Sequence, residues 1–267
     1  MRKVILITGA TDGIGLETAK LLAAAGHDLL IHGRSIAKLN TIKKLLSTIP
    51  NAGSINSYLA DLSAFSDVKK LIVDIKNEHK NLDVLINNAG VFKASNTTTP
   101  EGLDVRFVVN TISPYSLAQA LLSLLGNSGR IINLSSAAQS PVYIEALLGK
   151  AELSDMEAYA QSKLAITMWS KVLAEKLNGE GPTVIAVNPG SLLASKMVKE
   201  GFGFEGHDLS IGAKILVRMA LEDGIAKHTG EYFDNDIGQF SQPHPDGLNP
   251  KKSAAVIEAI ETIINLH

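Results

Sequence analysis

Cysteine is absent from the 267-residue sequence. Its absence excludes disulfide bonds, thiolate metal sites and cysteine nucleophiles, and it fits a reducing compartment, so we expect the cytoplasm. The seven histidines are scattered and form no HExxH pair or other ligand spacing. Because a protein metal site needs such a cluster of ligands, we expect no metal.

The sequence also lacks a clear excess of either positive or negative charge. The formal net charge is −2, and no stretch concentrates lysine and arginine. A nucleic-acid partner is therefore not expected, because such proteins carry a basic surface. The first apolar run, Val4 to Ile7, ends at once in Thr8-Gly9. It is too short for a signal-peptide core, so we expect a buried strand there and no membrane span.

The chain shows no internal repeat, low-complexity tract or linker. We therefore expect one domain over residues 1–267, with cofactor binding mainly in 1–135 and the catalytic helix, a substrate lid and a closing helix in 136–267.

Short β-rich runs alternate with longer helical stretches, which is typical of repeated βαβ units. The expected strands are Val4–Ile7, Asp28–His32, Ile55–Leu59, Val84–Ile86, Arg130–Leu134 and Val184–Val187. The expected helices are Gly13–Ala25, Ile36–Leu46, Phe65–Glu78, Glu101–Leu125, Asp155–Leu177, Ile211–Leu221 and Lys251–Asn265. The fold class is α/β, a doubly wound parallel sheet of about seven strands with helices on both faces.

One helix start has a specific local signal. Thr99-Pro100-Glu101 offers a capping residue, a proline at the first helical position and an acid in the first turn. The pattern predicts that the fourth long helix begins there.

A glycine-rich turn follows the first strand directly and opens a helix. It reads Thr8-Gly9-Ala10-Thr11-Asp12-Gly13-Ile14-Gly15. Glycines there let the backbone approach a pyrophosphate, and the helix N-terminus offers N–H groups and a positive dipole end. A glycine-rich turn without a ligand is the alternative, and the strand-loop-helix context makes it the weaker one.

The spacing TGxxxGxG, together with the motifs below, resembles the short-chain dehydrogenase/reductase family from Lys3 to about Gly190. The resemblance implies a Rossmann-type domain, a nicotinamide cofactor, hydride transfer at an alcohol or carbonyl, and a homodimer or homotetramer. The tetrapeptide His32-Gly33-Arg34-Ser35 and the long segment from Ser136 to Tyr159 are similar to the retinol-dehydrogenase-like branch. We do not expect the N-terminal membrane anchor that is common in that branch.

The residues at the end of the second predicted strand indicate whether the cofactor is NAD or NADP. An acid there would bond the ribose 2′-hydroxyl, and here Gly33 stands in its place. Arg34 offers a bidentate donor suited to a 2′-phosphate, with Ser35 and Lys38 nearby. We therefore expect NADP(H), although Asp12 lies where some NADP-preferring relatives carry a basic residue. A solvated surface role for Arg34 is the alternative.

Further cofactor positions come from the resemblance alone. It implies that Asp61 bonds the adenine amino group and Leu62 supplies a backbone contact. The turn Asn87-Asn88-Ala89-Gly90 would border the adenosine ribose. The expected cofactor-binding residues are Gly9, Thr11, Asp12, Gly13, Ile14, Gly15, Arg34, Ser35, Asp61, Leu62, Asn88, Ala89, Gly90, Tyr159, Lys163, Pro189, Gly190 and Leu192.

Tyr159 and Lys163 lie four residues apart on a predicted helix and so share one face. A neighbouring ammonium lowers the pKa of a phenol and makes it a better acid and base. A YxxxK pattern alone is short, and a tyrosine beside a solvated lysine is its commoner meaning. The pair Ser135-Ser136, at the carboxyl end of a strand, changes that judgement because open α/β sheets bind ligands at this edge.

The resemblance assigns the catalytic roles. The second serine of such a pair is catalytic, so Ser136 polarises the substrate oxygen, with Ser135 as the alternative. Tyr159 exchanges the proton, Lys163 bonds the nicotinamide ribose, and Asn110 holds a water that links the lysine to solvent. The turn Asn188-Pro189-Gly190 would lie beside the nicotinamide.

One position departs from the family pattern. Family members often carry a threonine five residues after that proline, where this chain has Ala194 beside Ser195. The apolar residues between Leu192 and Phe204 favour a substrate lid or, equally, a surface helix.

Two other functions stay open. A nucleotide-sugar epimerase shares the tyrosine and lysine but carries a TGxxGxxG loop and a larger C-terminal domain. A catalytically silent NADP(H) sensor or scaffold protein is the second, and the joint presence of Asn110, Ser136, Tyr159 and Lys163 disfavours it.

Overall fold

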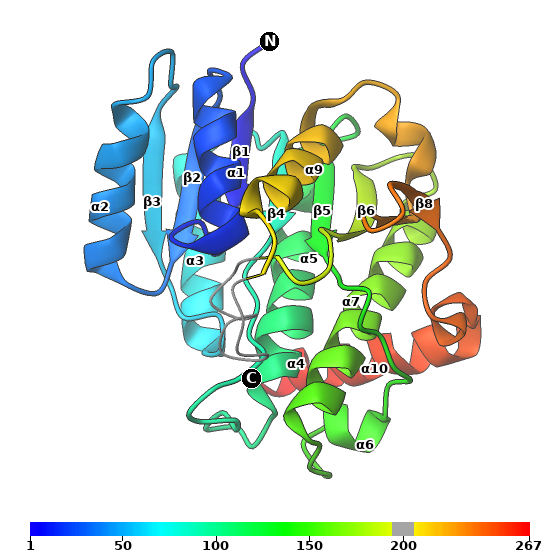
Figure 1. Cartoon of the computed structure of the whole chain (residues 1–267). Helices are drawn as coiled ribbons and strands as arrows, with labels where there is room; N and C mark the ends of the chain where they lie inside the picture. Colours follow the sequence, from blue (N-terminus) through cyan, green and yellow to red (C-terminus); the bar gives the residue numbers. More distant parts are fainter. Residues whose placement is uncertain (194–205) are drawn as a thin grey trace.

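The computed structural model describes residues 1–193 and 206–267. In this part of the chain eight strands form one sheet in the order β3-β2-β1-β4-β5-β6-β7-β8 (Figure 1). The strands are β1 Val4–Ile7, β2 Asp28–Gly33, β3 Ile55–Leu59, β4 Val84–Asn87, β5 Arg130–Leu134, β6 Thr183–Asn188, β7 Tyr232–Asp234 and β8 Gln239–Ser241.

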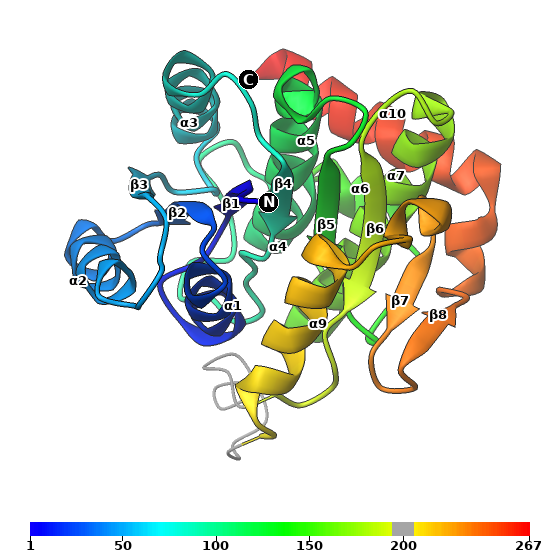
Figure 2. The ribbon, with the colours of Figure 1, turned by 90° about the horizontal axis from the view of Figure 1, so that it is seen from above.

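Helices cover both faces of this sheet. They are α1 Gly13–Ala24, α2 Ile36–Ser47, α3 Phe65–Glu78, α4 Val105–Phe107, α5 Ser113–Leu125, α6 Ile144–Leu147, α7 Asp155–Leu177, α9 Leu209–Leu221 and α10 Pro250–Leu266. Figure 2 shows α1, α2 and α9 on one side of the sheet and α3, α5, α7 and α10 on the other.

The strands are continuous apolar runs because both of their faces are buried. In β1, Leu6 packs into the core beneath α3, α5 and α7, whereas Ile5 and Ile7 pack into the core beneath α1, α2 and α9. All three side chains are fully buried. Because successive side chains of a strand point to opposite faces, each strand contributes residues to both hydrophobic cores.

The crossover between the two halves of the sheet positions the site. Strand β1 pairs in parallel with β2 on one side and with β4 on the other, so Ile5 is opposite Leu29 and Val84. Helices leave the carboxyl ends of these strands in opposite directions, and a crevice opens between them.

The doubly wound α/β fold is confirmed, and the six expected strands match to within a residue at each end. The expected parallel sheet of about seven strands corresponds to β1–β7, which all pair in parallel, but the eighth strand was not predicted. Strands β7 and β8 form an antiparallel hairpin, with Phe233 opposite Phe240. Each has three residues, which is too short for hydrophobic alternation to predict.

The expected helix start at Thr99-Pro100-Glu101 is also wrong. Thr98 and Asp104 form an isolated antiparallel bridge, and the Thr99 N–H donates to the Leu103 carbonyl. The residues between them turn tightly instead of starting a helix. Helix α4 begins at Val105, and its N-cap is Asp104, whose carboxylate accepts from the Arg106 N–H.

A turn of π-helix, Val108–Ile112, separates α4 from α5 and was not expected. The segment Val105–Leu125 is long and apolar enough to cross a membrane by composition, and 67% of its most apolar window is buried inside the protein. It is the core helix against which α3 and α7 pack.

Helix α10 contacts the helices of Asn110 and Tyr159, through which the resemblance implies that a dimer or tetramer would form. It packs against α7, and its Glu261 accepts a hydrogen bond from Tyr115 of α5 at 2.7 Å. The chain's own C-terminal helix therefore covers part of the face through which such an interface would form. The oligomeric state stays a prediction.

Candidate active site

The phosphate loop between β1 and α1 has the backbone shape that its glycines predict. Gly9 and Gly13 have φ of +67° and +54°, a region that disfavours side chains. A Cβ on Gly15 would lie 2.3 Å from the Gly9 carbonyl oxygen and 2.4 Å from Nδ2 of Asn88. The loop therefore closes tightly on the turn after β4.

Asp12 and Lys38 flank this loop. The Asp12 carboxylate caps α1 by accepting from the Gly13 N–H, and it pairs with Nζ of Lys38 at 3.1 Å. Both side chains are more than half exposed. Because Lys38 balances the acid, Asp12 does not leave the mouth of the loop with uncompensated negative charge.

The end of β2 explains why Gly33 is a glycine. A Cβ there would lie 2.7 Å from the methyl carbon of Thr11, so an acidic side chain would have to displace the Thr11 side chain of the phosphate loop. Arg34 follows, exposed at the cleft, and it makes no hydrogen bond or ion pair with any described residue. Ser35 has a structural task as the N-cap of α2, accepting from the Lys38 N–H.

His32, which the sequence did not single out, connects two parts of the cofactor cleft. The ring is 3% exposed, and its Nδ1 accepts from the Gly9 N–H at 3.2 Å. The other nitrogen, Nε2, lies 3.1 Å from the Ala60 carbonyl oxygen at the end of β3. Burial lowers the pKa of this imidazole to about 4.

The turn after β4 braces the phosphate loop. Nδ2 of Asn88 donates to the carbonyls of Thr8 and Gly9, while the Asn88 and Ala89 N–H groups donate to the Thr8 hydroxyl. The sequence assigned Asn88 and Ala89 to the cofactor. In the structure both already stabilise the loop that would bind it.

Asp61 and Leu62 follow β3. One Asp61 oxygen accepts from the Ser63 N–H and hydroxyl at 2.9 and 2.7 Å, so the residue caps a turn. The Leu62 carbonyl accepts from the Ser113 hydroxyl. Both residues still line the cleft.

One cleft of about 920 Å³ brings most of the predicted residues together. It is lined by Gly9, Thr11, Asp12, Gly13, Ile14, Arg34, Asp61, Leu62, Asn88, Ala89, Gly90, Tyr159, Lys163 and Pro189. The predicted residues Gly15, Ser35, Asn110, Ser136, Gly190 and Leu192 are not part of its lining. The shape and donor set fit an extended dinucleotide, with the phosphate loop near the middle.

Helix α7 holds Tyr159 and Lys163 at this cleft. It begins with a capping box in which Ser154 and Glu157 satisfy each other's backbone N–H groups. Tyr159, half-buried, has its phenol beside the side chain of Ser136. Burial raises the pKa of the phenol, and the polar contact with Ser136 lowers it by a smaller amount.

The two serines after β5 point to different partners. The Ser135 hydroxyl is buried and bonds the Lys163 carbonyl at 3.0 Å and the Thr167 hydroxyl at 2.7 Å. Ser136 is the serine that reaches Tyr159. Ser135 lines the cleft and Ser136 does not, so the contact with Tyr159 is the observation that favours Ser136 as the group that would meet a substrate.

Lys163 lies beneath the tyrosine. Its Nζ donates to the Leu134 carbonyl at 2.7 Å and stands 5.6 Å from the centroid of the Tyr159 ring. Burial lowers its pKa to about 8. An ammonium next to the phenol stabilises the phenolate form.

Asn110 lies in the π-helical turn, fully inside the protein. Its side-chain amide bonds both the N–H and the carbonyl of Val91, and it donates to the Ser162 hydroxyl at 2.9 Å. It therefore ties the turn after β4 to the catalytic helix. π-Turns are frequent at functional sites, where they displace backbone groups from the helical ladder.

The Pro189-Gly190 turn after β6 is tied to the β7–β8 hairpin. The Pro189 carbonyl accepts from Asn235, and the Gly190 N–H donates to Asn188. Leu192 has φ of +55° and accepts a backbone bond from His207. Ala194, Ser195 and the lid expected up to Phe204 lie outside the described residues.

Sequence reasoning also missed the wall formed by residues 91–100. This segment lines the cleft, and the Phe92 ring packs edge-on against Tyr159 with centroids 5.2 Å apart. The available signal was its place directly after the Asn87–Gly90 turn. The segment from Ser136 to Tyr159 was expected to form a wall of the substrate pocket. Of its residues, only Tyr159 lines the cleft.

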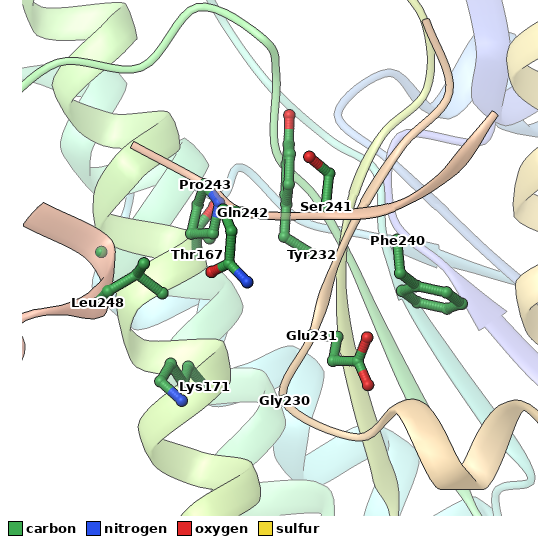
Figure 3. A pocket seen from close by; sticks show the side chains of 11 residues that line it. Thr167, Lys171, Gly230, Glu231, Tyr232, Phe240, Ser241, Gln242, Pro243 and Leu248 are labelled. Atoms are coloured by element: carbon green, nitrogen blue, oxygen red, sulfur yellow. The ribbon is translucent and has the colours of Figure 1, made fainter. Parts of the chain in front are cut away.

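A second cavity of about 210 Å³ lies between α7 and the β7–β8 hairpin (Figure 3). Lys171 of α7 lines it together with Tyr232 and Gln242 from the β7–β8 region. Tyr232 connects it to the active site, because its hydroxyl donates to the Ser136 carbonyl at 3.1 Å.

Known proteins match this arrangement over most of the chain. The family model described as short chain dehydrogenase matches residues 3–203. The chain belongs to the short-chain dehydrogenase family. Human retinol dehydrogenase 13 is 30% identical over 260 residues, covering 87% of this chain and 76% of its own length.

Two further matches add detail. The short-chain dehydrogenase TIC 32 A of Brassica napus, described as chloroplastic, is 32% identical over 252 residues, covering 85% of this chain and 78% of its own. The Pseudomonas aeruginosa RhlG/NADP active-site complex has a TM-score of 0.71 and 26% identity, covering 88% of this chain and 95% of its own. The predicted resemblance to the retinol-dehydrogenase-like branch is confirmed, and the short-chain dehydrogenase is an oxidoreductase that uses a nicotinamide cofactor.

Proposed function

We propose that this short-chain dehydrogenase is an NADP(H)-dependent oxidoreductase that moves a hydride between nicotinamide and an alcohol or carbonyl substrate. Tyr159 is its general acid and base. The position of Tyr159 above Lys163, in the same cleft that the phosphate loop lines, carries this proposal.

The bound nicotinamide ring supplies or accepts the hydride. In reduction, the Ser136 hydroxyl donates to the substrate oxygen and Tyr159 gives that oxygen its proton; oxidation reverses the proton transfer. Because burial raises the phenol's pKa, Tyr159 starts protonated, as an acid must. The Lys163 ammonium then stabilises the phenolate, and a pKa of about 8 leaves it mostly charged at neutral pH.

The preference for NADP(H) rests on Gly33 and Arg34. An acid that would repel a 2′-phosphate is absent at position 33, where its Cβ would collide with the Thr11 side chain. Arg34 stands exposed at the same place without a described partner, and a guanidinium binds phosphate with two parallel hydrogen bonds. The NADP named in the RhlG complex supports the same cofactor.

The substrate class follows from the cleft wall and the relatives. Val91, Phe92, Val105 and Val109 line the cleft together, so an apolar alcohol or aldehyde fits best, in keeping with the name retinol dehydrogenase. We keep the cytoplasm and a homo-oligomer as expectations. One relative is described as chloroplastic, so the compartment of this protein should be determined directly by imaging.

Absorbance loss of NADPH with a panel of aldehydes and ketones, retinal among them, tests the reaction. Tyr159→Phe should lower turnover by at least about 100-fold and leave NADPH binding unchanged. Tyr143→Phe, at an exposed tyrosine outside the cleft, is the matched control. Near-parental turnover of Tyr159→Phe would refute the assignment, and NADPH binding without turnover of any substrate would favour the sensor function.

A separate measurement tests the cofactor. Arg34→Ala should raise the KM for NADPH by about tenfold or more and leave the KM for NADH nearly unchanged. A parental enzyme that prefers NADH contradicts the NADP assignment without affecting the proton-transfer roles.

A further inference from the structure

We propose that His32 is a positioning residue for the cofactor, because its ring connects the phosphate loop to the end of β3, where the adenosine half would bind. The inference rests on the proposed binding of NADP(H) in this cleft. Neither the phosphate-loop motif nor the residues assigned to the adenine and the 2′-phosphate include this histidine.

The two ring nitrogens have different partners, which determines the tautomer. The Gly9 N–H can only donate, so Nδ1 must carry a lone pair; the Ala60 carbonyl can only accept, so Nε2 must carry the proton. A neutral imidazole with the proton on Nε2 is the form that makes both bonds. A doubly protonated ring would lose the bond from Gly9.

The Gly9 peptide is held on both of its sides. His32 accepts from its N–H, and Nδ2 of Asn88 donates to its carbonyl at 3.1 Å. Gly9 has φ of +67°, so the chain here leaves the strand ladder and its N–H needs a side-chain partner. The histidine therefore fixes the orientation of the first glycine in the loop.

The sheet itself does not depend on this ring. Backbone bonds already join the same three strands at this level: the Ala10 N–H donates to the His32 carbonyl, and the Ala60 N–H donates to the Gly33 carbonyl. The imidazole adds a direct link from the phosphate loop to the residue before Asp61. Phosphate binding by backbone N–H groups requires that those groups be held in place before the ligand arrives.

The chain offers a matched control on the same strand. His27, just before β2, is 7% exposed, and its Nδ1 accepts from the Lys3 N–H at 3.1 Å. The burial and the type of hydrogen bond are therefore similar at the two ends of β2. His27 does not line the cleft.

Four variants separate positioning from simple stability. His32→Leu removes both bonds, His32→Asn keeps an acceptor near the Nδ1 position, and His32→Gln keeps a donor near the Nε2 position. His27→Leu is the control. Calorimetry measures the binding of NADPH and of adenosine 2′-monophosphate, which lacks the pyrophosphate, and steady-state kinetics measure KM and kcat.

His32→Leu should weaken NADPH binding about tenfold and raise the KM for NADPH to the same extent, with kcat at saturating NADPH nearly unchanged. Binding of adenosine 2′-monophosphate should change by less than about twofold, since the phosphate loop contributes little to it. His32→Asn should recover more NADPH affinity than His32→Gln. His27→Leu should bind NADPH as the parent does.

Three results would overturn the inference: parental NADPH affinity in His32→Leu, an equal loss for both ligands, or better recovery by Gln than by Asn. If His32→Leu does not fold, the NADPH affinities of His32→Asn and His32→Gln still test the inference, because the Asn variant should bind more tightly. A parental protein that binds no nicotinamide dinucleotide would instead refute the proposed function.

Discussion

Arg106 is a charged side chain that the fold buries almost completely, and its replacement by methionine should destabilise the protein strongly. The side chain is 2% exposed. Its Nε and Nη2 atoms donate to the two oxygens of Asp104, and Nη1 donates to Asp155, the first residue of α7. One guanidinium thus joins α4 to the start of the helix that carries Tyr159.

The expected magnitude follows from the exposure of the partners. Removing one member of a buried ion pair costs about 3–5 kcal/mol, because the other charge remains without compensation. Here Asp104 is 17% exposed and Asp155 is 45% exposed, so water solvates the second carboxylate in part. Arg106→Met fills similar volume, and we therefore expect a loss near the lower limit, about 3 kcal/mol.

Urea unfolding followed by fluorescence measures this loss directly. The chain has one tryptophan, Trp169, which is fully buried and packs edge-on against Tyr115. The control is Lys70→Met, which removes the exposed Lys70–Asp74 pair on α3 and should leave the free energy of unfolding nearly unchanged. A loss below about 1 kcal/mol for Arg106→Met, or one equal to the control, would refute the reasoning.

Three further outcomes are expected. Gly15→Ala places a methyl group 2.3 Å from a backbone oxygen, so it should lower the unfolding free energy by about 1–3 kcal/mol and weaken NADPH binding. In the control Gly13→Asn the added Cβ meets no atom within 4 Å, so stability and NADPH binding should change much less. Equal effects of the two substitutions would contradict the clash at Gly15. The pKa of His32 is about 4 in the folded protein, below its ordinary value of 6.5; the unfolded chain alone then takes up a proton as pH falls, and stability should drop by about 2 kcal/mol between pH 6.5 and 4.5. His32→Asn should remove most of that slope in urea titrations, and an unchanged slope would show that other groups cause it. Tyr232→Phe removes a donor to the carbonyl of the proposed catalytic serine and should lower kcat about three- to tenfold without changing the KM for NADPH; a parental kcat would show that this bond has no role in positioning.

Local patterns in the sequence were sufficient for most of the secondary structure. The alternation of short β-rich runs with longer helical stretches predicted a parallel sheet, and α3 and α7 were predicted with correct bounds. Local patterns failed where a distant contact decided the outcome. Thr99-Pro100-Glu101 looks like a helix start, yet the bridge between Thr98 and Asp104 holds it in a turn.

In the candidate site, too, some features could be predicted from local sequence and others could not. The phosphate loop and the spacing of Tyr159 and Lys163 were determined by residues close in sequence, so the sequence alone determined the family and the place where a cofactor would lie. Only the tertiary structure decided that Ser136 rather than Ser135 reaches Tyr159, and that His32 joins Gly9 to Ala60 across three strands. These contacts depend on side-chain directions and strand register, which arise when distant segments pack together and which no short motif encodes.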